Sequence, residues 1–156
     1  MQSFDFSDVD ELYREIILDH YRSPRNQAEL EDADIVSEGV NPFCGDEVYL
    51  RMSLDGDVVD GVSFHGTGCS ISQASASMLT EAIKGKSLED AESLYFLFRD
   101  MMQGRDPTSE EQDRLGEVES LAGVKNFPIR IKCALLAWAA LEDGIRAHHR
   151  RTRDGG

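Results

Sequence analysis

Apolar residues recur at helical spacing near the start of the chain and again around its middle. The first of these stretches predicts a helix over residues 8–21, for which Ser7 or Asp8 can serve as the N-terminal cap. A second helix is expected directly after Cys69, because small and apolar residues there follow the helical period until Gly85 interrupts them.

The stretch between these helices alternates apolar and polar residues, as half-buried strands do. Residues 47–54 alternate strictly, and the Asp-Gly pair behind them is a strong signal for a tight hairpin turn. The return strand over residues 58–65 is expected to place Val58, Val62 and Phe64 on one face of the sheet.

Two more helices are expected in the C-terminal half of the chain. Ser87 is suited to cap the first of them. The other begins at about Pro128, since proline suits the first helical position, and runs to about His148. Its apolar residues cover a wide arc that includes Trp138, which predicts a well-buried helix. The polar and acidic residues 103–123 between the two helices are expected to form a loop with at most one helical turn.

The order of these elements predicts an α+β fold. Residues 35–39 are expected to add an edge strand, so that a small antiparallel sheet of about three strands carries packed helices on one face. The chain has 156 residues, of which 40% are apolar, and is long enough for one compact core. We expect a single domain over residues 1–148, followed by a basic tail over residues 149–156.

The net charge of the chain argues against some classes of function. The chain carries 16 Lys and Arg against 30 Asp and Glu, a formal net charge of -14, and such a surface repels the phosphates of nucleic acids. No apolar run approaches the ~20 residues of a membrane span, and the N-terminus lacks the pattern of a signal peptide. We therefore expect a cytoplasmic protein that binds neither nucleic acid nor membrane. The basic end of the chain, with His148 and His149, is either a frayed terminus or a contact for a partner.

Three cysteines provide the candidate chemistry. An odd number of cysteines without an export signal argues against a disulfide framework, so they are free thiols, metal ligands or reactive groups. Cys44 lies in a turn-rich loop before a strand, which is a poor place for a core thiol. Cys69 lies where the amide N–H groups at a helix start favour a thiolate. Cys133, in the second turn of the last helix, is the best candidate for a plain core residue.

Two neighbours of these cysteines belong to the same hypothesis. Asp46 follows Cys44 by two residues, and three thiolates with one carboxylate would complete a tetrahedral zinc site. Soft thiolates also suit Cu(I) or an iron–sulfur cluster. Arg130 lies three residues before Cys133 on the same helical face, where its charge would offset that of the thiolates. The spacing alone matches no short zinc-ribbon pattern, and the simpler interpretation of Asp46 is a surface residue at a turn.

Four segments of the chain match the motifs of a known family. They are LDHYRSPRN (18–26), NPFCGD (41–46), GTGCSISQASASM (66–78) and FPIRIKCAL (127–135). With all four in order over about residues 8–146, the chain resembles the IscU/NifU-N superfamily, and more narrowly its SufU-type branch. The resemblance implies a three-stranded sheet with packed helices, in agreement with the pattern. It also implies one metal-binding set, which consists of Cys44, Asp46, Cys69 and Cys133.

The resemblance further implies a chemistry and its partners. In the SufU-type branch the bound ion is zinc, and the protein accepts sulfur as a persulfide from a PLP-dependent SUF-type cysteine desulfurase. A downstream SUF cluster scaffold then receives the sulfur. The classical IscU scaffolds have a histidine immediately before the third cysteine, where this chain has Lys132, and that departure favours sulfur transfer. The alternatives are a scaffold that assembles iron or a 2Fe-2S cluster on the same cysteines, and a purely structural zinc domain.

Within the implied set, the residues are expected to have different roles. Cys44 is expected to be the sulfur acceptor, because its Pro/Gly loop can move whereas Cys69 and Cys133 are anchored on helices, and the resemblance points to the same residue. Zinc would keep this thiol deprotonated and protected. Asp46 is expected to be both a ligand and an electrostatic tuner, and Arg130 to give electrostatic support.

Overall fold

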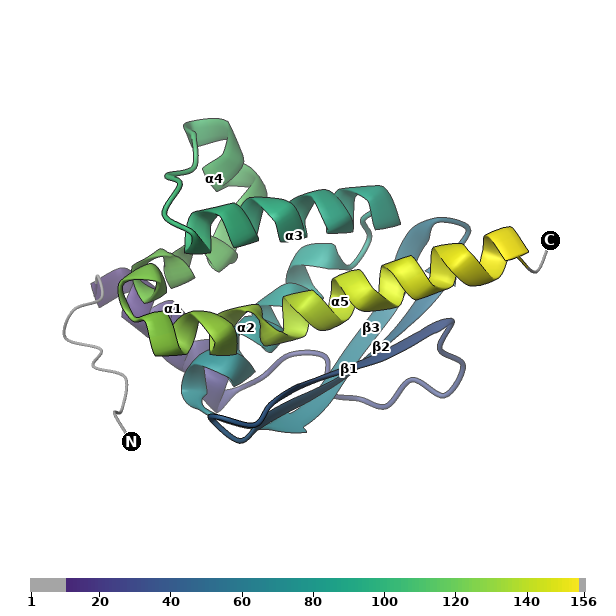
Figure 1. The fold of residues 1–156 in the computed structure, drawn as a ribbon, viewed down its shortest axis with the longest axis horizontal. Helices are drawn as coiled ribbons and strands as arrows, with labels where there is room; N and C mark the ends of the chain where they lie inside the picture. Colours follow the sequence, from purple (N-terminus) through teal and green to yellow (C-terminus); the bar gives the residue numbers. More distant parts are fainter. Residues whose placement is uncertain (1–10, 155–156) are drawn as a thin grey trace.

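The structure, a computed structural model, describes residues 11–154, so the caps expected at Ser7 and Asp8 lie outside the described residues. Three antiparallel strands form one sheet in the order β1-β2-β3, and helices cover one of its faces (Figure 1). The expected α+β fold is thereby confirmed. In chain order the elements are α1 (Glu11–Arg22), β1 (Ile35–Asn41), β2 (Asp46–Asp55), β3 (Val58–Thr67), α2 (Ser70–Ile83), α3 (Leu88–Met102), α4 (Ser109–Leu115), the 3-10 helix η2 (Gly116–Asn126) and α5 (Pro128–Asp154).

The middle strand β2 shows the predicted alternation of buried and exposed residues. Val48, Leu50 and Met52 are fully buried in the core, while Tyr49 on the opposite face is 42% exposed. The expected edge strand is also present, and β1 continues beyond its expected end to Asn41. The turn after Asn41 therefore joins two strands of the sheet.

The return strand β3 differs from the prediction at its start. Val62 and Phe64 are buried as expected, but Val58 is 40% exposed and Val59 is fully buried in its place. The register between β2 and β3 shifts just before Leu54, which lies opposite Val59. An extra residue of this kind moves the residues beyond it to the other face of the sheet, and it explains why the prediction for Val58 is wrong.

The last helix, α5, has 27 residues and lies along β1 on the covered face of the sheet (Figure 1). Two glycines permit this close approach. A Cβ atom at Gly39 would lie 3.0 Å from Leu136 Cδ1, and one at Gly144 would lie 2.8 Å from Ile35 Cγ2. The helix extends beyond its expected end, so residues 149–154 are helical rather than frayed. None of the helices in the described part of the chain has the length and hydropathy of a membrane span.

A buried hydrogen-bond network holds α2 against α5. The hydroxyl of Ser75 donates to the carbonyl oxygen of Ala134 at 2.6 Å and accepts from Nε1 of Trp138 at 3.1 Å. All three residues are fully buried, which confirms the prediction that the helix around Trp138 is well covered. The network also fixes the start of α5, which carries Cys133.

The prediction of a loop over residues 103–123 is wrong, because much of this segment is helical. Thr108 caps α4 through a capping box with Glu111, in which each side chain accepts a hydrogen bond from the other residue's backbone N–H. The 3-10 helix η2 follows, and the buried apolar residues from the end of α4 onward lie three apart, which is the period of a 3-10 helix. These buried residues are Leu115, Val118, Leu121 and Val124.

Candidate metal centre

Several elements begin or end at one place in the fold, where they bring the candidate residues together. Cys44 lies in the turn of residues 42–45 that joins β1 to β2, and Asp46 is the first residue of β2. Cys69 is the N-cap of α2, and Cys133 lies in the second turn of α5. One end of the sheet and the N-termini of two helices therefore gather side chains from three distant parts of the sequence.

A close group of possible ligand atoms forms at this place. One ligand atom each from Cys44, Asp46 and Cys133 lies within 4.8 Å of the others. Cys69 is not a member of this group, although its backbone N–H donates to Asp46 Oδ1 at 2.9 Å. The structure thus brings three of the four expected ligands together and places the fourth beside them.

Asp46 is fully buried, which is rare for a carboxylate. Its Oδ1 accepts hydrogen bonds from the backbone N–H of Cys69 at 2.9 Å and from the hydroxyl of Ser72 at 3.3 Å. Its Oδ2 is buried without a hydrogen-bond partner among residues 11–154. Such an orphaned oxygen is costly unless a cation or a donor satisfies it. Together with the neighbouring thiols, this carboxylate makes a donor set that fits zinc.

Gly68 is a site residue whose importance the sequence pattern did not reveal. A Cβ atom at Gly68 would lie 2.5 Å from Ser72 Oγ and closer still to Asp46 Oδ1. A Cβ atom at Gly66 would likewise overlap the carbonyl oxygen of Glu47. The carboxylate of Asp46 can therefore lie against the backbone before α2 only because residue 68 has no side chain, and β2 can approach residue 66 for the same reason. The Gly-Thr-Gly sequence predicted a tight turn, but it did not indicate what packs against it.

The two helix-borne thiols have opposite electrostatic surroundings. The hydrogen bond with Cys133 lowers the pKa of Cys69 to about 6 against the effect of burial, and the backbone N–H groups at the start of α2 contribute. The same hydrogen bond, together with burial, raises the pKa of Cys133. Cys69 is therefore the more acidic thiol of the pair. This agrees with the prediction that the helix start favours a thiolate at Cys69.

Two cations near the site differ in their burial. Arg130 is only 7% exposed, and although burial lowers its pKa, the charge of Cys69 and a hydrogen bond with Cys133 raise it overall. Arg130 therefore balances negative charge on the thiols. Lys132 is exposed, and its ammonium lies 5.5 Å from the centre of the Phe43 ring, so it contacts an aromatic ring.

A hollow of about 450 Å³ connects the site with solvent. Cys44 and Phe43 line one side of it, and Ile129 and Arg130 line the other. Cys44 is half-buried, whereas Cys133 is fully buried. Cys44 is thus more accessible from outside than Cys133.

Two known proteins align with most of this chain. The zinc-dependent sulfurtransferase SufU of Bacillus subtilis (strain 168) is 52% identical over 139 residues, which make up 89% of this chain and 92% of that protein. The iron–sulfur cluster assembly scaffold protein IscU of Streptococcus pyogenes serotype M1 is 41% identical over 140 residues, or 90% of this chain and 86% of that protein. The chain is therefore similar both to a transferase and to a scaffold.

A solved structure has the same fold. A protein of Fervidobacterium islandicum AW-1, described as an iron–sulfur cluster assembly scaffold for the SUF system, superposes with a TM-score of 0.81 at 35% identity. The superposition covers 91% of this chain and 99% of that one. The family model for the NifU-like N terminal domain matches residues 12–134, which include all four candidate ligands. The chain therefore belongs to the NifU-like N-terminal domain family, as the motifs of its sequence predicted.

Proposed function

We propose that this protein is a zinc-dependent sulfurtransferase that accepts persulfide sulfur for iron–sulfur cluster assembly. The observation that carries the proposal is the meeting of Cys44, Asp46 and Cys133 within 4.8 Å, with the thiolate of Cys69 beside them. The Bacillus subtilis relative, which is 52% identical, is named for the same activity. The site combines a half-buried thiol on a turn with three groups anchored at the start of a strand and on two helices.

Cys44 is the sulfur acceptor in this proposal. Its thiolate attacks the outer sulfur of a persulfide on the donor protein, so that a new S–S bond forms at Cys44 and the bond between the two donor sulfurs breaks. The donor cysteine leaves as a thiolate, and the transfer needs no external oxidant or reductant. The half-buried position of Cys44 in a turn, beside a hollow open to solvent, supports this role.

The remaining residues of the set hold the metal. Asp46, Cys69 and Cys133 are the anchored ligands, and Cys44 completes the set. When bound, zinc keeps the thiols deprotonated and protects them from side reactions. The orphaned Oδ2 of Asp46 supports its role as a ligand. Arg130 stabilises the negative charge of the set from its buried position.

The donor in this proposal is a PLP-dependent SUF-type cysteine desulfurase, and a downstream SUF cluster scaffold receives the sulfur in the cytoplasm. Similarity to SufU and to a protein of the SUF system supports this assignment. The transfer chemistry belongs to a single domain over residues 1–148. The basic segment that follows, over residues 149–156, continues α5 as far as Asp154.

A cluster scaffold is the alternative function, because two of the similar proteins are described as scaffolds. Lys132, immediately before Cys133, contacts the Phe43 ring and so adds no ligand for a cluster. Metal analysis of the protein purified without oxygen separates the two functions. A colourless protein with about one zinc per chain supports transfer, whereas visible absorbance with stoichiometric iron supports the scaffold.

Persulfide formation on a Cys44→Ser variant tests the proposed transfer. Incubated with a cysteine desulfurase and cysteine, the wild-type chain is expected to gain about 32 Da, the mass of one sulfur atom, while Cys44→Ser gains none. Mass spectrometry of intact protein and of the peptide that contains residue 44 measures the gain. An undiminished gain on the folded Cys44→Ser variant would show that another residue is the acceptor.

A further inference from the structure

The helix α5 carries one stripe of accessible residues along most of its length. The members are separated by three, four or seven residues, so they share one face of the helix. They are exposed or half-buried, and they comprise Lys132, Leu135, Ala139, Arg146, Arg150 and Arg153. Asp143 adds one acidic group between the two halves of the stripe. The stripe begins beside the candidate metal centre and ends in the basic segment near the C-terminus.

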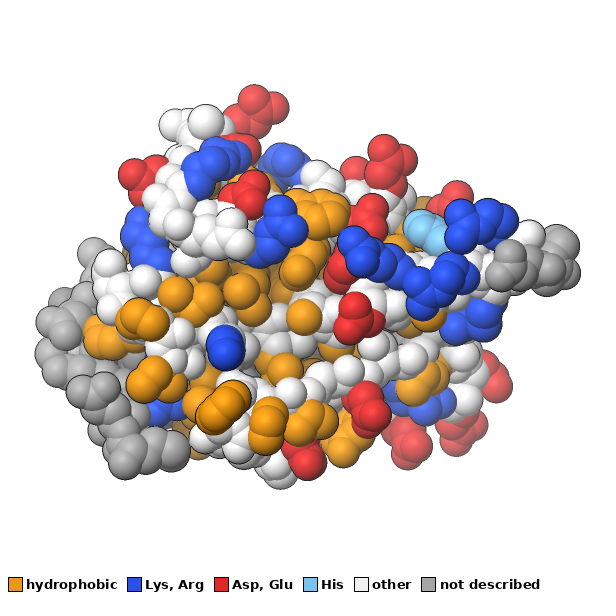
Figure 2. Space-filling model, in the orientation of Figure 1, with side chains coloured by type: hydrophobic (Ala, Val, Ile, Leu, Met, Phe, Trp, Pro, Cys, Tyr) orange, Lys and Arg blue, Asp and Glu red, His pale blue; other side chains and the backbone are white. Residues whose placement is uncertain are grey.

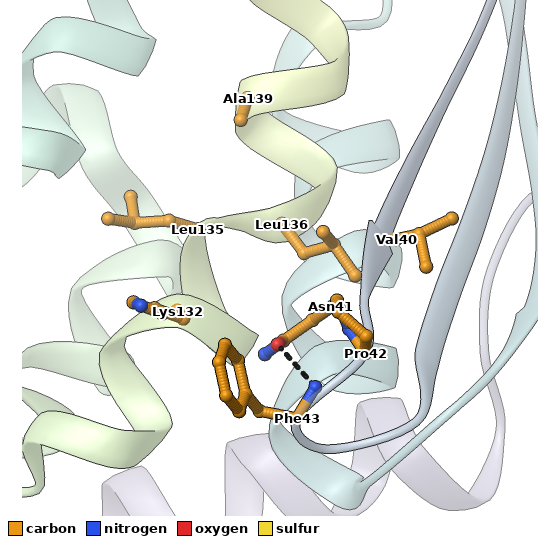
Figure 3. Close-up of a pocket in the computed structure, with 8 residues that line it drawn as sticks. All are labelled: Val40, Asn41, Pro42, Phe43, Lys132, Leu135, Leu136 and Ala139. Atoms are coloured by element: carbon orange, nitrogen blue, oxygen red, sulfur yellow. Dashed lines mark hydrogen bonds between the residues drawn. The ribbon is translucent and has the colours of Figure 1, made fainter.

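At its first end the stripe borders an apolar groove between α5 and the end of β1 (Figure 3). The groove has a volume of about 360 Å³, and Val40, Leu135 and Ala139 are among the residues that line it. Val40 is 54% exposed, and Phe43, which directly precedes Cys44, is 84% exposed. Apolar side chains gathered on a surface in this way are typical of a place that another protein covers.

At its other end the stripe is basic, although the chain as a whole has a net charge of -14. Figure 2 shows the two halves on one face of the molecule, with apolar side chains over the start of α5 and Lys and Arg side chains over its end. The distance from Lys132 to Arg150 along the helix is about 27 Å at about 1.5 Å per residue. This length is comparable to the width of a standard protein interface, which covers about 800 Å² of each partner.

We propose that this α5 stripe is the docking surface for the protein that carries the donor persulfide. The partner places an apolar side chain in the groove at Val40 and acidic side chains opposite Arg150 and Arg153. This inference rests on the proposed function, because the partner is defined by the sulfur that it delivers.

Two arguments favour this occupant of the stripe. A protein whose sulfur reaches Cys44 has to cover Phe43, and the groove is continuous with that contact. Guanidinium groups at the basic end pair with carboxylates, and such complementarity steers association. Nucleic acid also carries negative charge, but the acidic body of this chain repels it.

Charge reversal on the stripe tests the proposal in a desulfurase assay. Arg150→Glu is compared with Arg151→Glu, which makes the same change in charge on the next residue of the same helix but off the stripe. At low salt, Arg150→Glu is expected to raise the half-saturating concentration of this chain about fivefold, while Arg151→Glu stays within about twofold of the wild type. The difference is expected to disappear near ~0.5 M salt, where such charges are screened.

The groove is tested with a second matched pair. Val40 and Val36 are both exposed on β1, at 54% and 61%, but Val40 lines the groove and Val36 does not. Val40→Asp is expected to raise the half-saturating concentration about tenfold, because it places a charge at the edge of the groove in which the partner packs. Val36→Asp is expected to behave like the wild type.

A small donor such as glutathione persulfide separates docking from chemistry. It needs no docking surface, so Arg150→Glu and Val40→Asp are expected to accept its sulfur at the wild-type rate. Slow reaction with the small donor would assign the defect of these variants to the site itself and overturn the docking proposal. Equal half-saturating concentrations within either matched pair would also overturn it. If the wild-type chain accepts no sulfur from either donor, the proposed function itself fails.

Discussion

Cys44 and Cys133 contribute ligand atoms to the same close group, yet they belong to opposite kinds of local structure. Cys44 lies in a turn between strands, where its backbone N–H donates to Asn41 O at 3.3 Å and its neighbour Phe43 is 84% exposed. Cys133 is fully buried in α5, with its sulfur 3.9 Å from the carbonyl oxygen of Ile129 one turn earlier. The two thiols therefore differ in access and in how firmly the backbone holds them.

Because of this difference, one site can both hold a metal and exchange a sulfur atom. The group that meets a partner lies on a short surface turn, where motion is least costly. The groups that define the metal position lie on elements that the core fixes, and Asp46 belongs with them because Cys69 and Ser72 both donate to its Oδ1. Four fully buried ligands would hold a metal firmly, but they would give a donor protein no access.

Removal of a fixed ligand is expected to have the largest effect. Asp46→Ala deletes the orphaned carboxylate oxygen and leaves the backbone N–H of Cys69 without its acceptor, so zinc affinity is expected to fall at least about 100-fold. Competition with a coloured chelator measures the change. Glu47→Ala is the matched control, because Glu47 is the next residue of β2 and faces solvent. If Asp46→Ala keeps one zinc per chain and full sulfur acceptance, Asp46 is not one of the anchored ligands.

In the metal-free protein, substitutions of Cys133 and of Cys44 are expected to differ in their effect on stability. Cys133→Ser places a hydroxyl at a fully buried position and is expected to lower the free energy of unfolding by about 1–3 kcal/mol. Cys44→Ser makes the same change in a half-buried turn and is expected to cost less than about 0.5 kcal/mol. Urea unfolding followed by circular dichroism measures both values. Equal losses would mean that the turn is as firmly packed as the helix.

The parts of the fold that could be predicted are those with a regular pattern over many residues. The alternation of β2, the cap at Ser87 and the helix from Pro128 all follow from local rules, and the structure contains each of them. The prediction failed where a local signal was hidden or overridden. The bulge before Leu54 showed in the pattern only as Asp60 on the apolar face of the strand, and the acidic composition of residues 103–123 concealed a three-residue apolar period.

The candidate site shows a similar division. The residue types and their positions near element ends indicated that Cys44, Asp46 and Cys133 could meet, and the structure brings them together. The position of Cys69 outside the close group and the need for glycine at residue 68 could not be predicted, because both depend on contacts between residues distant in sequence. These details depend on how side chains pack at the end of the sheet, and the periodicity of the sequence does not reveal that packing.

The smallest expected effect is a shift in the pKa of Cys69 when Cys133 is replaced in the metal-free protein. Iodoacetamide reacts with thiolates, so alkylation of Cys69 is expected to rise with pH and reach half its maximum near the pKa of about 6 that its hydrogen bond with Cys133 produces. In Cys133→Ala this bond is lost, and the midpoint is expected to move up by about one pH unit or more, towards the ordinary value for a thiol. Peptide mass spectrometry over a pH series gives the midpoint.

The matched control for this measurement is Cys44→Ala, since Cys44 is not among the groups that shift the pKa of Cys69. If the midpoint stays near 6 in both variants, the backbone N–H groups at the start of α2 are sufficient to lower the pKa of Cys69. Cys69 and Cys133 then titrate independently. If Cys133→Ala alone raises it, Cys69 and Cys133 act as one unit with a single shared proton.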